Sequence, residues 1–316
     1  MNEKLSSCRL GGWLVVAMSG PLVYLAGRQS WLAIVAAAGV SLLCCWAVFS
    51  LGDHKLLDFR ILCLLEYGFL ATVCVGVSGW SAAVWPTGQG YPVVPLTLLA
   101  LATAASWKGA NQASKGVGVL FWLVTILYSV LLVLGLRNIQ PAYLMPQWET
   151  PGDLTWFVLL LPCAAQFLPR EHGRPGGYIS IVFAIALLIT VWTEGNLSRG
   201  AAIQVSWPFY EAGESVRLFG VASRLESFIS VGATVGFYGL YTLLISAAGH
   251  LAESVEMGFG KWGVLAAGFL SGAGVLLHWK IPYFVLVLGA FVLWVALPVL
   301  GSKILQRKCE KEQKNA

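Results

Sequence analysis

Charged side chains are scarce in this chain. Aspartate, glutamate, lysine and arginine make up 11% of its 316 residues, whereas they make up about 25% of an ordinary soluble domain. Hydrophobic residues account for 58%, and the mean hydropathy is +0.75. This shortage of charge excludes a soluble globular protein. The net charge of +5 calls for no nucleic acid, because basic residues retained at an anionic membrane surface account for it.

Motifs for catalysis and for metal binding are also missing. The sequence holds no nucleophile elbow, no phosphate-binding glycine-rich loop and no H-E-x-x-H pair. The four histidines fall at segment ends or in loops without a metal-ligand partner at short spacing. Most of the seven cysteines lie in apolar segments, where they serve as small apolar fillers. We therefore expect neither an enzyme nor a bound metal or cofactor.

Long apolar runs dominate what is present. A membrane-spanning helix needs roughly 20 mostly apolar residues, and the runs lack the alternation of a membrane β-barrel. The sequence predicts one all-α integral membrane domain over residues 1–316, with tails at 1–9 and 305–316 and about ten transmembrane helices. These are residues 10–27, 31–51, 61–85, 92–106, 117–136, 153–168, 178–194, 228–250, 262–277 and 282–304. The fourth and sixth are short and contain or border prolines.

The basic residues predict the orientation of these helices. Most of the 20 lysines and arginines fall on the side of the N-terminus, and cytoplasmic loops retain such residues. We expect both termini in the cytoplasm. The first segment has no convincing cleavage site and is interpreted as a true span.

The loop at 195–227 carries much of the external polar content. Within it, Phe209, Ala212, Val216 and Phe219 recur at helical spacing. This spacing predicts a short external helix. The helix is either an interfacial anchor or a lid over an external vestibule.

The first helix contains a candidate break at Ser19, Gly20 and Pro21. Proline removes a helical hydrogen bond and glycine tolerates unwinding, and ligands or ions commonly use the freed backbone groups. A simple proline kink is the alternative.

The sixth helix repeats this pattern, with Pro162, Cys163, Ala164 and Ala165 ahead of Gln166. Breaks in helices one and six predict an inverted repeat of two five-helix halves.

Several stretches together resemble one family. They are MSGPLVYLA (18–26), GRQSWLAIVAAAGVSLL (27–43), the fourth and fifth segments with their following loop (99–146), and WPFYEAGESVRLFGVASRLESFISVGATVGFYGLYTLL (207–244). The chain resembles the endospore germination permeases, the GerAB-type B subunits of nutrient germinant receptors. These belong to the amino acid–polyamine–organocation (APC) transporter superfamily, which has a LeuT-like fold.

The resemblance implies a nutrient sensor in the cell membrane or the inner spore membrane. Such a sensor would bind a small germinant such as an amino acid and work beside an A subunit and a lipoprotein C subunit. It further implies a ligand pocket formed by the breaks in helices one and six, with side chains of the third and eighth helices beside them. The expected ligand-binding residues are Ser19, Gly20, Pro21, Glu66, Tyr67, Pro162, Cys163, Ala164, Gln166, Thr234 and Tyr238.

Glu66 is an acidic residue within an apolar segment, and such residues are functional candidates by default. It is either a protonatable group that couples ligand binding to conformation, beside Tyr67, or the partner of a basic residue near the cytoplasmic surface.

The eighth segment carries Ser230 and Thr234 at a spacing that places them on one helix face. Adjacent hydroxyls for a sodium site are lacking. Its Gly232, Gly236 and Gly239 favour close helix packing.

The leading hypothesis is thus a germinant-sensing permease subunit. An amino acid or cation-coupled transporter and a purely structural membrane subunit are the alternatives.

Overall fold

The structure is a computed structural model that describes residues 5–49, 60–84, 92–145, 152–169, 176–214, 226–279 and 281–300. The described elements are α1 (Ser7–Leu25), α2 (Trp31–Phe49), α3 (Arg60–Val84), α4 (Val93–Trp107), α5 (Ala110–Gly135), η2 (Leu136–Asn138), η3 (Pro141–Leu144), α6 (Asp153–Ala165), α7 (Gly176–Leu197), α8 (Arg199–Gln204), α9 (Pro208–Glu214), α10 (Glu226–Val255), α11 (Gly260–Leu276), α12 (Tyr283–Ala290) and the π-helix η4 (Phe291–Ala296).

Each of the ten predicted segments coincides with an apolar helix. Seven of these helices are long and apolar enough to cross a membrane, and α4, α6 and α11 are shorter. The expected shortness of the fourth and sixth segments is confirmed. The structure therefore supports the all-α membrane class.

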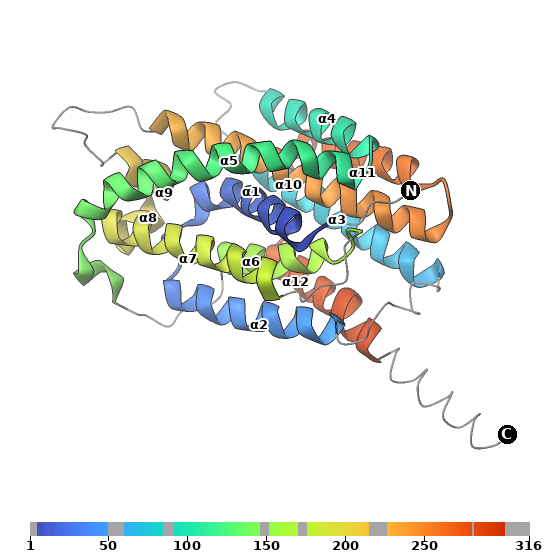
Figure 1. The fold of residues 1–316 in the computed structure, drawn as a ribbon, viewed down its shortest axis with the longest axis horizontal. Coiled ribbons are helices and arrows are strands. Elements are labelled where there is room, and N and C mark those ends of the chain that lie inside the picture. Colours follow the sequence, from blue (N-terminus) through green and yellow to red (C-terminus); the bar gives the residue numbers. More distant parts are fainter. Residues whose placement is uncertain are drawn as a thin grey trace, which may run out of the picture.

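Helix α1 lies at the centre of the bundle. Figure 1 shows it between α5 and α10 on one side and α6 and α7 on the other. Of the residues in the apolar stretch of each helix, 83% are buried in α1, 28% in α2 and 22% in α5. A helix that is apolar all round and almost fully buried belongs in a core, whereas α2 and α5 keep faces for lipid.

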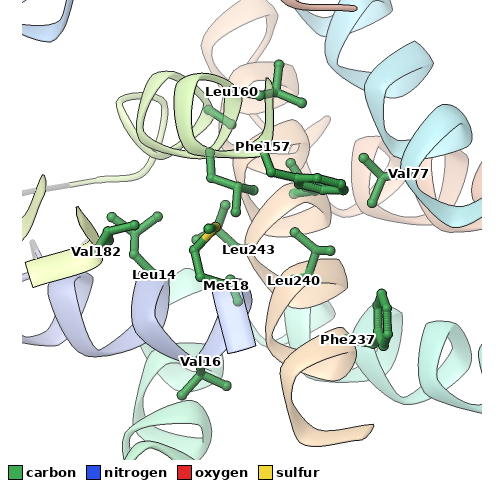
Figure 2. Packing of buried hydrophobic residues seen from close by; sticks show 14 of the residues in the cluster. Leu14, Val16, Met18, Val77, Phe157, Leu160, Val182, Phe237, Leu240 and Leu243 are labelled. Carbon is green, nitrogen blue, oxygen red and sulfur yellow. The ribbon is translucent and has the colours of Figure 1, made fainter. Parts of the chain in front are cut away.

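Side chains from several helices fill the interior around α1. Figure 2 shows Met18 of α1, Phe157 of α6 and Leu243 of α10 meeting there. All three are fully buried. The centre of the bundle is a packed apolar core.

The helices form two groups by their contacts. In one, α1 packs against α6 and α7, and α2 packs against the same two helices. In the other, α3, α4, α10 and α11 pack together. The close contact of α1 with α10 joins the groups.

Glycines shape that contact. A Cβ on Gly236 of α10 would lie 2.2 Å from the backbone nitrogen of Gly20, and a Cβ on Gly20 would lie 2.9 Å from that of Phe237. The Trp13 indole N–H donates to the Gly239 carbonyl at 3.1 Å. Small residues let two helix backbones approach in this way, so the predicted packing role of the α10 glycines is confirmed.

The predicted break in the first helix is wrong. Helix α1 runs without interruption through Ser19, Gly20 and Pro21 to Leu25. Pro21 falls near the C-terminal end, where the lost hydrogen bond disturbs little of the helix. Close packing of Gly20 against α10 holds the backbone helical there.

The break predicted in the sixth helix is wrong as well. Helix α6 is continuous through Pro162, Cys163 and Ala164 and ends at Ala165. Pro162 again lies in the final turn, so its effect is confined to the end of the helix.

The described part of the segment predicted as an external loop contains two short helices where one was expected. Helix α9 matches the first part of the predicted external helix, and Phe209 and Ala212 are fully buried. Helix α8 begins after Ser198, whose hydroxyl accepts a hydrogen bond from the Ala201 N–H. Val216, Phe219 and the C-terminal tail at 305–316 lie outside the described residues.

Candidate functional site at one end of the bundle

The residues predicted in the first helix belong to a packing surface. The Ser19 hydroxyl donates to the Val16 carbonyl of its own helix at 2.7 Å. Its carbonyl accepts from the Tyr128 hydroxyl of α5 at 3.4 Å. Gly20 and Pro21 are buried against neighbouring helices. The backbone of α10 occupies the space that a ligand would need beside Gly20.

The residues predicted in the sixth helix face α2 and α12. Pro162 and Ala164 are buried, and Cys163 lines an apolar groove of about 410 Å³ between α2, α6 and α12. Gln166 follows the helix, and its side-chain amide donates to the Trp294 carbonyl at 3.4 Å.

The third- and eighth-helix candidates lie elsewhere. Glu66 is 4% exposed, and the Tyr67 hydroxyl donates to the Gly263 carbonyl of α11 at 3.0 Å. Thr234 donates to Ser230 within its own helix, and Tyr238 is half-buried. The predicted residues are thus distributed over several packing surfaces. Their role in ligand binding stays a prediction.

A different set of polar residues gathers where α1 ends and α2 begins. We call this the distal end of the bundle, and the end where α1 begins the proximal end. The turn after α1 contains Gly27, whose φ of 79° is left-handed and which therefore favours glycine. A Cβ on Gly27 would lie 2.9 Å from the Thr193 side chain of α7. The turn is thereby held against α7.

The next residues of this turn reach two other segments. The Gln29 side-chain oxygen accepts from the Thr155 N–H at 3.0 Å, near the start of α6. The Arg28 Nη2 donates to the Val205 and Ser206 carbonyls at 2.7 and 2.9 Å. Arg28 thereby ties the chain ahead of α9 to the end of α1.

Arg28 and Asp153 bring opposite charges together. Burial lowers the pKa of the Arg28 guanidinium, and the negative charge of Asp153 raises it in part; arginine stays protonated nonetheless. Among the described residues, Arg28 and Asp153 form no direct ion pair, and the Arg28 Nε is buried without a hydrogen-bond partner. Within the described part of the chain, the Arg28 guanidinium therefore retains hydrogen-bonding capacity for a further group.

Two more polar atoms at this end lack partners. The buried Tyr283 hydroxyl, which lies within electrostatic range of Asp153, has no hydrogen-bond partner in the described part of the chain. Glu194 is 1% exposed; it accepts from the Trp31 backbone N–H, but its Oε2 is similarly unsatisfied within the described ranges. Leaving buried polar atoms unpaired costs free energy, so these atoms mark a candidate ligand site.

An aromatic cluster adjoins these polar residues. The Tyr283 ring lies 4.8 Å from Phe157 and 5.8 Å from Trp80. The Tyr24 ring lies 6.3 Å from both Trp80 and Trp207. We define the aromatic cluster as Tyr24, Trp80, Phe157, Trp207, Phe237, Tyr241 and Tyr283. Ligand sites in proteins typically combine such apolar walls with a few polar groups.

Sequence reasoning missed this distal site. Arg28 follows the first apolar segment and Asp153 begins the sixth, and neither was among the predicted ligand-binding residues. The signal available in the sequence was that these two residues carry opposite charges and lie at helix ends predicted to be on the same side of the membrane. Within the described ranges, no three His, Cys, Asp or Glu residues gather as a metal site.

Comparisons with known proteins identify no family. No protein-family model matches the chain, and no curated protein matches it.

Proposed function

We propose that the protein is a permease-like membrane subunit that binds an amino-acid-like nutrient at the distal end of its bundle. The observation that carries this proposal is the pair of Arg28 and Asp153, oppositely charged but not joined in an ion pair, beside the aromatic cluster. A free amino acid carries both a carboxylate and an ammonium group. Arg28 would take the carboxylate, since guanidinium groups match carboxylates geometrically, and Asp153 would take the ammonium group.

The aromatic cluster supports an apolar or aromatic ligand side chain. Trp80, Phe157 and Tyr283 come from α3, α6 and α12, so a bound ligand would contact both helix groups of the bundle. Binding between two groups of helices could then shift their relative position, as a signalling subunit requires.

The resemblance to germination permeases extends this proposal to a biological role. The nutrient would be a germinant in the inner spore membrane, and an A subunit and a lipoprotein C subunit would be the partners. Both termini would be cytoplasmic, which makes the distal end external. Nutrients would then reach Arg28 and Asp153 from outside.

We also propose that the ten apolar helices form an inverted repeat of two five-helix halves. The supporting observation is the pattern of neighbours. Helix α1 packs on α7 as α2 packs on α6, and α3 packs on α11 as α4 packs on α10. When only the ten apolar helices are counted, the counterpart of each helix lies five positions away, so that α6 corresponds to α1, α7 to α2, α10 to α3 and α11 to α4. Replacing each helix by its counterpart turns the α1–α7 contact into the α2–α6 contact and the α3–α11 contact into the α4–α10 contact. An odd number of helices per half inverts the second half in the membrane.

This repeat would differ from the transporters with discontinuous helices. Because α1 and α6 are continuous, few backbone groups are freed near their middles. Recognition would rest on the side chains at the distal end.

A proton-coupled transporter is the second candidate, and buried Glu66 in α3 favours it. A carboxyl group within a membrane helix can carry a proton. Glu66→Gln would then abolish acid-driven uptake, whereas a sensor with this substitution would respond normally across acidic pH.

The first experiment measures thermal unfolding of the purified protein in micelles with each amino acid in turn. A ligand at 100 times its dissociation constant stabilises a protein by about 2.7 kcal/mol. We expect at least one amino acid to raise the melting temperature of the wild type and to leave that of Arg28→Gln unchanged. Arg137→Gln, an exposed arginine near the same end, is the control and should behave as the wild type.

The outcomes separate the hypotheses. If no amino acid shifts the melting temperature, the binding proposal is wrong and a structural subunit remains. Uptake of the stabilising amino acid, radiolabelled, into proteoliposomes of the isolated chain would identify a transporter. Binding without uptake supports the sensor.

A further inference from the structure

A polar cavity of about 520 Å³ lies at the proximal end of the bundle, away from the distal site. It is formed by the α4–α5 turn, the end of α10 and the start of α11. Three lysines line it, Lys108, Lys115 and Lys261, with Glu253 as the acidic residue. The Glu253 carboxylate accepts from the Gly258 and Gly260 backbone N–H groups. The described residues that line the cavity therefore carry a net positive charge.

An apolar groove of about 610 Å³ runs from this cavity along α4 and α11. It is lined by small residues, among them Ala100, Gly268 and Gly272, and by larger apolar side chains. The Thr103 hydroxyl in the groove donates to the Leu99 carbonyl of its own helix. Among the described residues that line the groove beyond Trp107, no other polar side chain is present to recognise a polar ligand.

Trp107 lines both the cavity and the groove. The Lys261 ammonium lies 5.7 Å from the centre of its ring, within cation–π range. The groove extends along α4 from Trp107 to Leu96. At 1.5 Å per residue this is roughly 16 Å, about half the thickness of a bilayer's hydrocarbon core. A charged compartment therefore continues into an apolar channel one leaflet deep.

We propose that this composite surface binds one anionic phospholipid. The phosphate headgroup occupies the cavity between Lys108, Lys115 and Lys261, and an acyl chain lies in the α4–α11 groove. Charge complementarity selects the headgroup, because basic pockets between membrane helices attract anionic lipids at about 1 kcal/mol per lysine. The groove selects the chain by apolar contact.

The groove between α2, α6 and α12 provides an internal comparison. Its lining is apolar apart from Ser41 and includes Val40, Cys163 and Phe291, with no basic residue among the described residues that form it. This groove can contact lipid chains but has no means of selecting a headgroup. Of these two grooves, as far as the described residues show, only the one along α4 and α11 adjoins a cluster of lysines.

The location of the surface suggests a regulatory role. It joins α4, α10 and α11, which belong to one of the two helix groups. A lipid bound there would stabilise that group as a unit. Because the surface is far from Arg28 and Asp153 in the fold, amino acid binding and lipid binding can be tested separately.

The experiment titrates the full-length protein in micelles with phosphatidylglycerol and, in parallel, with phosphatidylcholine of the same chains, and follows bound lipid by native mass spectrometry. We expect phosphatidylglycerol to bind at least about tenfold more tightly than phosphatidylcholine. Replacing all three lysines by glutamine should weaken phosphatidylglycerol binding by about 100-fold, at about fivefold per lysine. Arg60→Gln removes a positive charge from the start of α3, outside the cavity, and should change the affinity by less than about twofold.

A second variant tests the groove independently of the lysines. Gly272→Leu fills it, since the nearest side-chain atom to a Cβ at Gly272 lies 4.0 Å away and the fold can accept the new side chain. It should weaken the binding of both lipids. Val40→Phe in the uncharged groove is the control and should leave the preference for phosphatidylglycerol intact.

Several results would overturn the proposal. Equal binding of the two lipids would show that the cavity selects no headgroup. Binding of glycerol phosphate as tight as that of the lipid would indicate a site for a free anion, and equally effective displacement by polyglutamate would indicate an acidic protein partner. Unchanged binding in both the triple-lysine variant and Gly272→Leu would place any bound lipid elsewhere.

Discussion

Gly236→Ala tests the close contact between α1 and α10. The added Cβ would lie 2.2 Å from the Gly20 nitrogen and 2.4 Å from the Ser19 hydroxyl oxygen. Because the first of these atoms belongs to the backbone, no side-chain rotation can relieve the contact. Ordinary contact begins near 3.4 Å, so the two helices must separate by about 1 Å.

The cost follows from this separation. A gap of 0.5–1 Å forfeits roughly a quarter to a half of each dispersion contact along the helix pair, and overpacking in cores costs about 1–3 kcal/mol. Alanine is a better helix former than glycine by up to about 1 kcal/mol. The net effect should be destabilisation by about 2 kcal/mol.

Gly118→Ala on α5 is the matched control, since no atom of another described segment lies within 4 Å of its added Cβ. Both variants would be unfolded with increasing SDS in mixed micelles, and the free energies of unfolding compared with that of the wild type. We expect Gly236→Ala to be less stable and Gly118→Ala to be equally or slightly more stable. If Gly236→Ala is as stable as Gly118→Ala, the close approach of α1 and α10 is refuted.

Three further predictions concern single side chains. Tyr283→Phe removes a hydroxyl that has no partner among the described residues, so the free energy of unfolding should stay unchanged or rise by about 1 kcal/mol, while amino acid affinity falls in a titration. Arg28→Gln removes two hydrogen bonds to the chain ahead of α9, and hydrogen exchange followed by mass spectrometry should speed up in that segment and not in α4. Trp13→Phe loses the bond to Gly239 and should cost about 1 kcal/mol in SDS unfolding; a neutral result would mean that this bond contributes nothing.

Much of the architecture could be predicted because the bilayer constrains sequence strongly. Each apolar segment became a helix, and the spacing of Gly232, Gly236 and Gly239 correctly indicated close packing. Both signals are local in the sequence.

The two helix breaks were predicted incorrectly because a proline acts according to its position. Pro21 and Pro162 both lie near the ends of their helices, where few helical hydrogen bonds follow that a proline could disturb. The contact that keeps Gly20 helical comes from α10, more than 200 residues away in the chain.

The distal site could not be found for a related reason. Arg28, Asp153 and Tyr283 lie at three separate helix ends, and each is unremarkable alone. What distinguishes them is that Asp153 lies within electrostatic range of both Arg28 and Tyr283, while the Arg28 Nε and the Tyr283 hydroxyl are buried without partners among the described residues. This follows only from the folded structure.

The most direct test of the proposed function measures dissociation constants for the stabilising amino acid, its methyl ester and its N-acetyl derivative. We expect the wild type to bind the free amino acid at least about tenfold more tightly than either derivative, as each derivative loses one charge-assisted contact. Arg28→Gln should no longer discriminate against the ester, and Asp153→Asn should no longer discriminate against the N-acetyl form, whereas Glu214→Gln at the same end should behave as the wild type. Full discrimination retained by both Arg28→Gln and Asp153→Asn would contradict the proposed site.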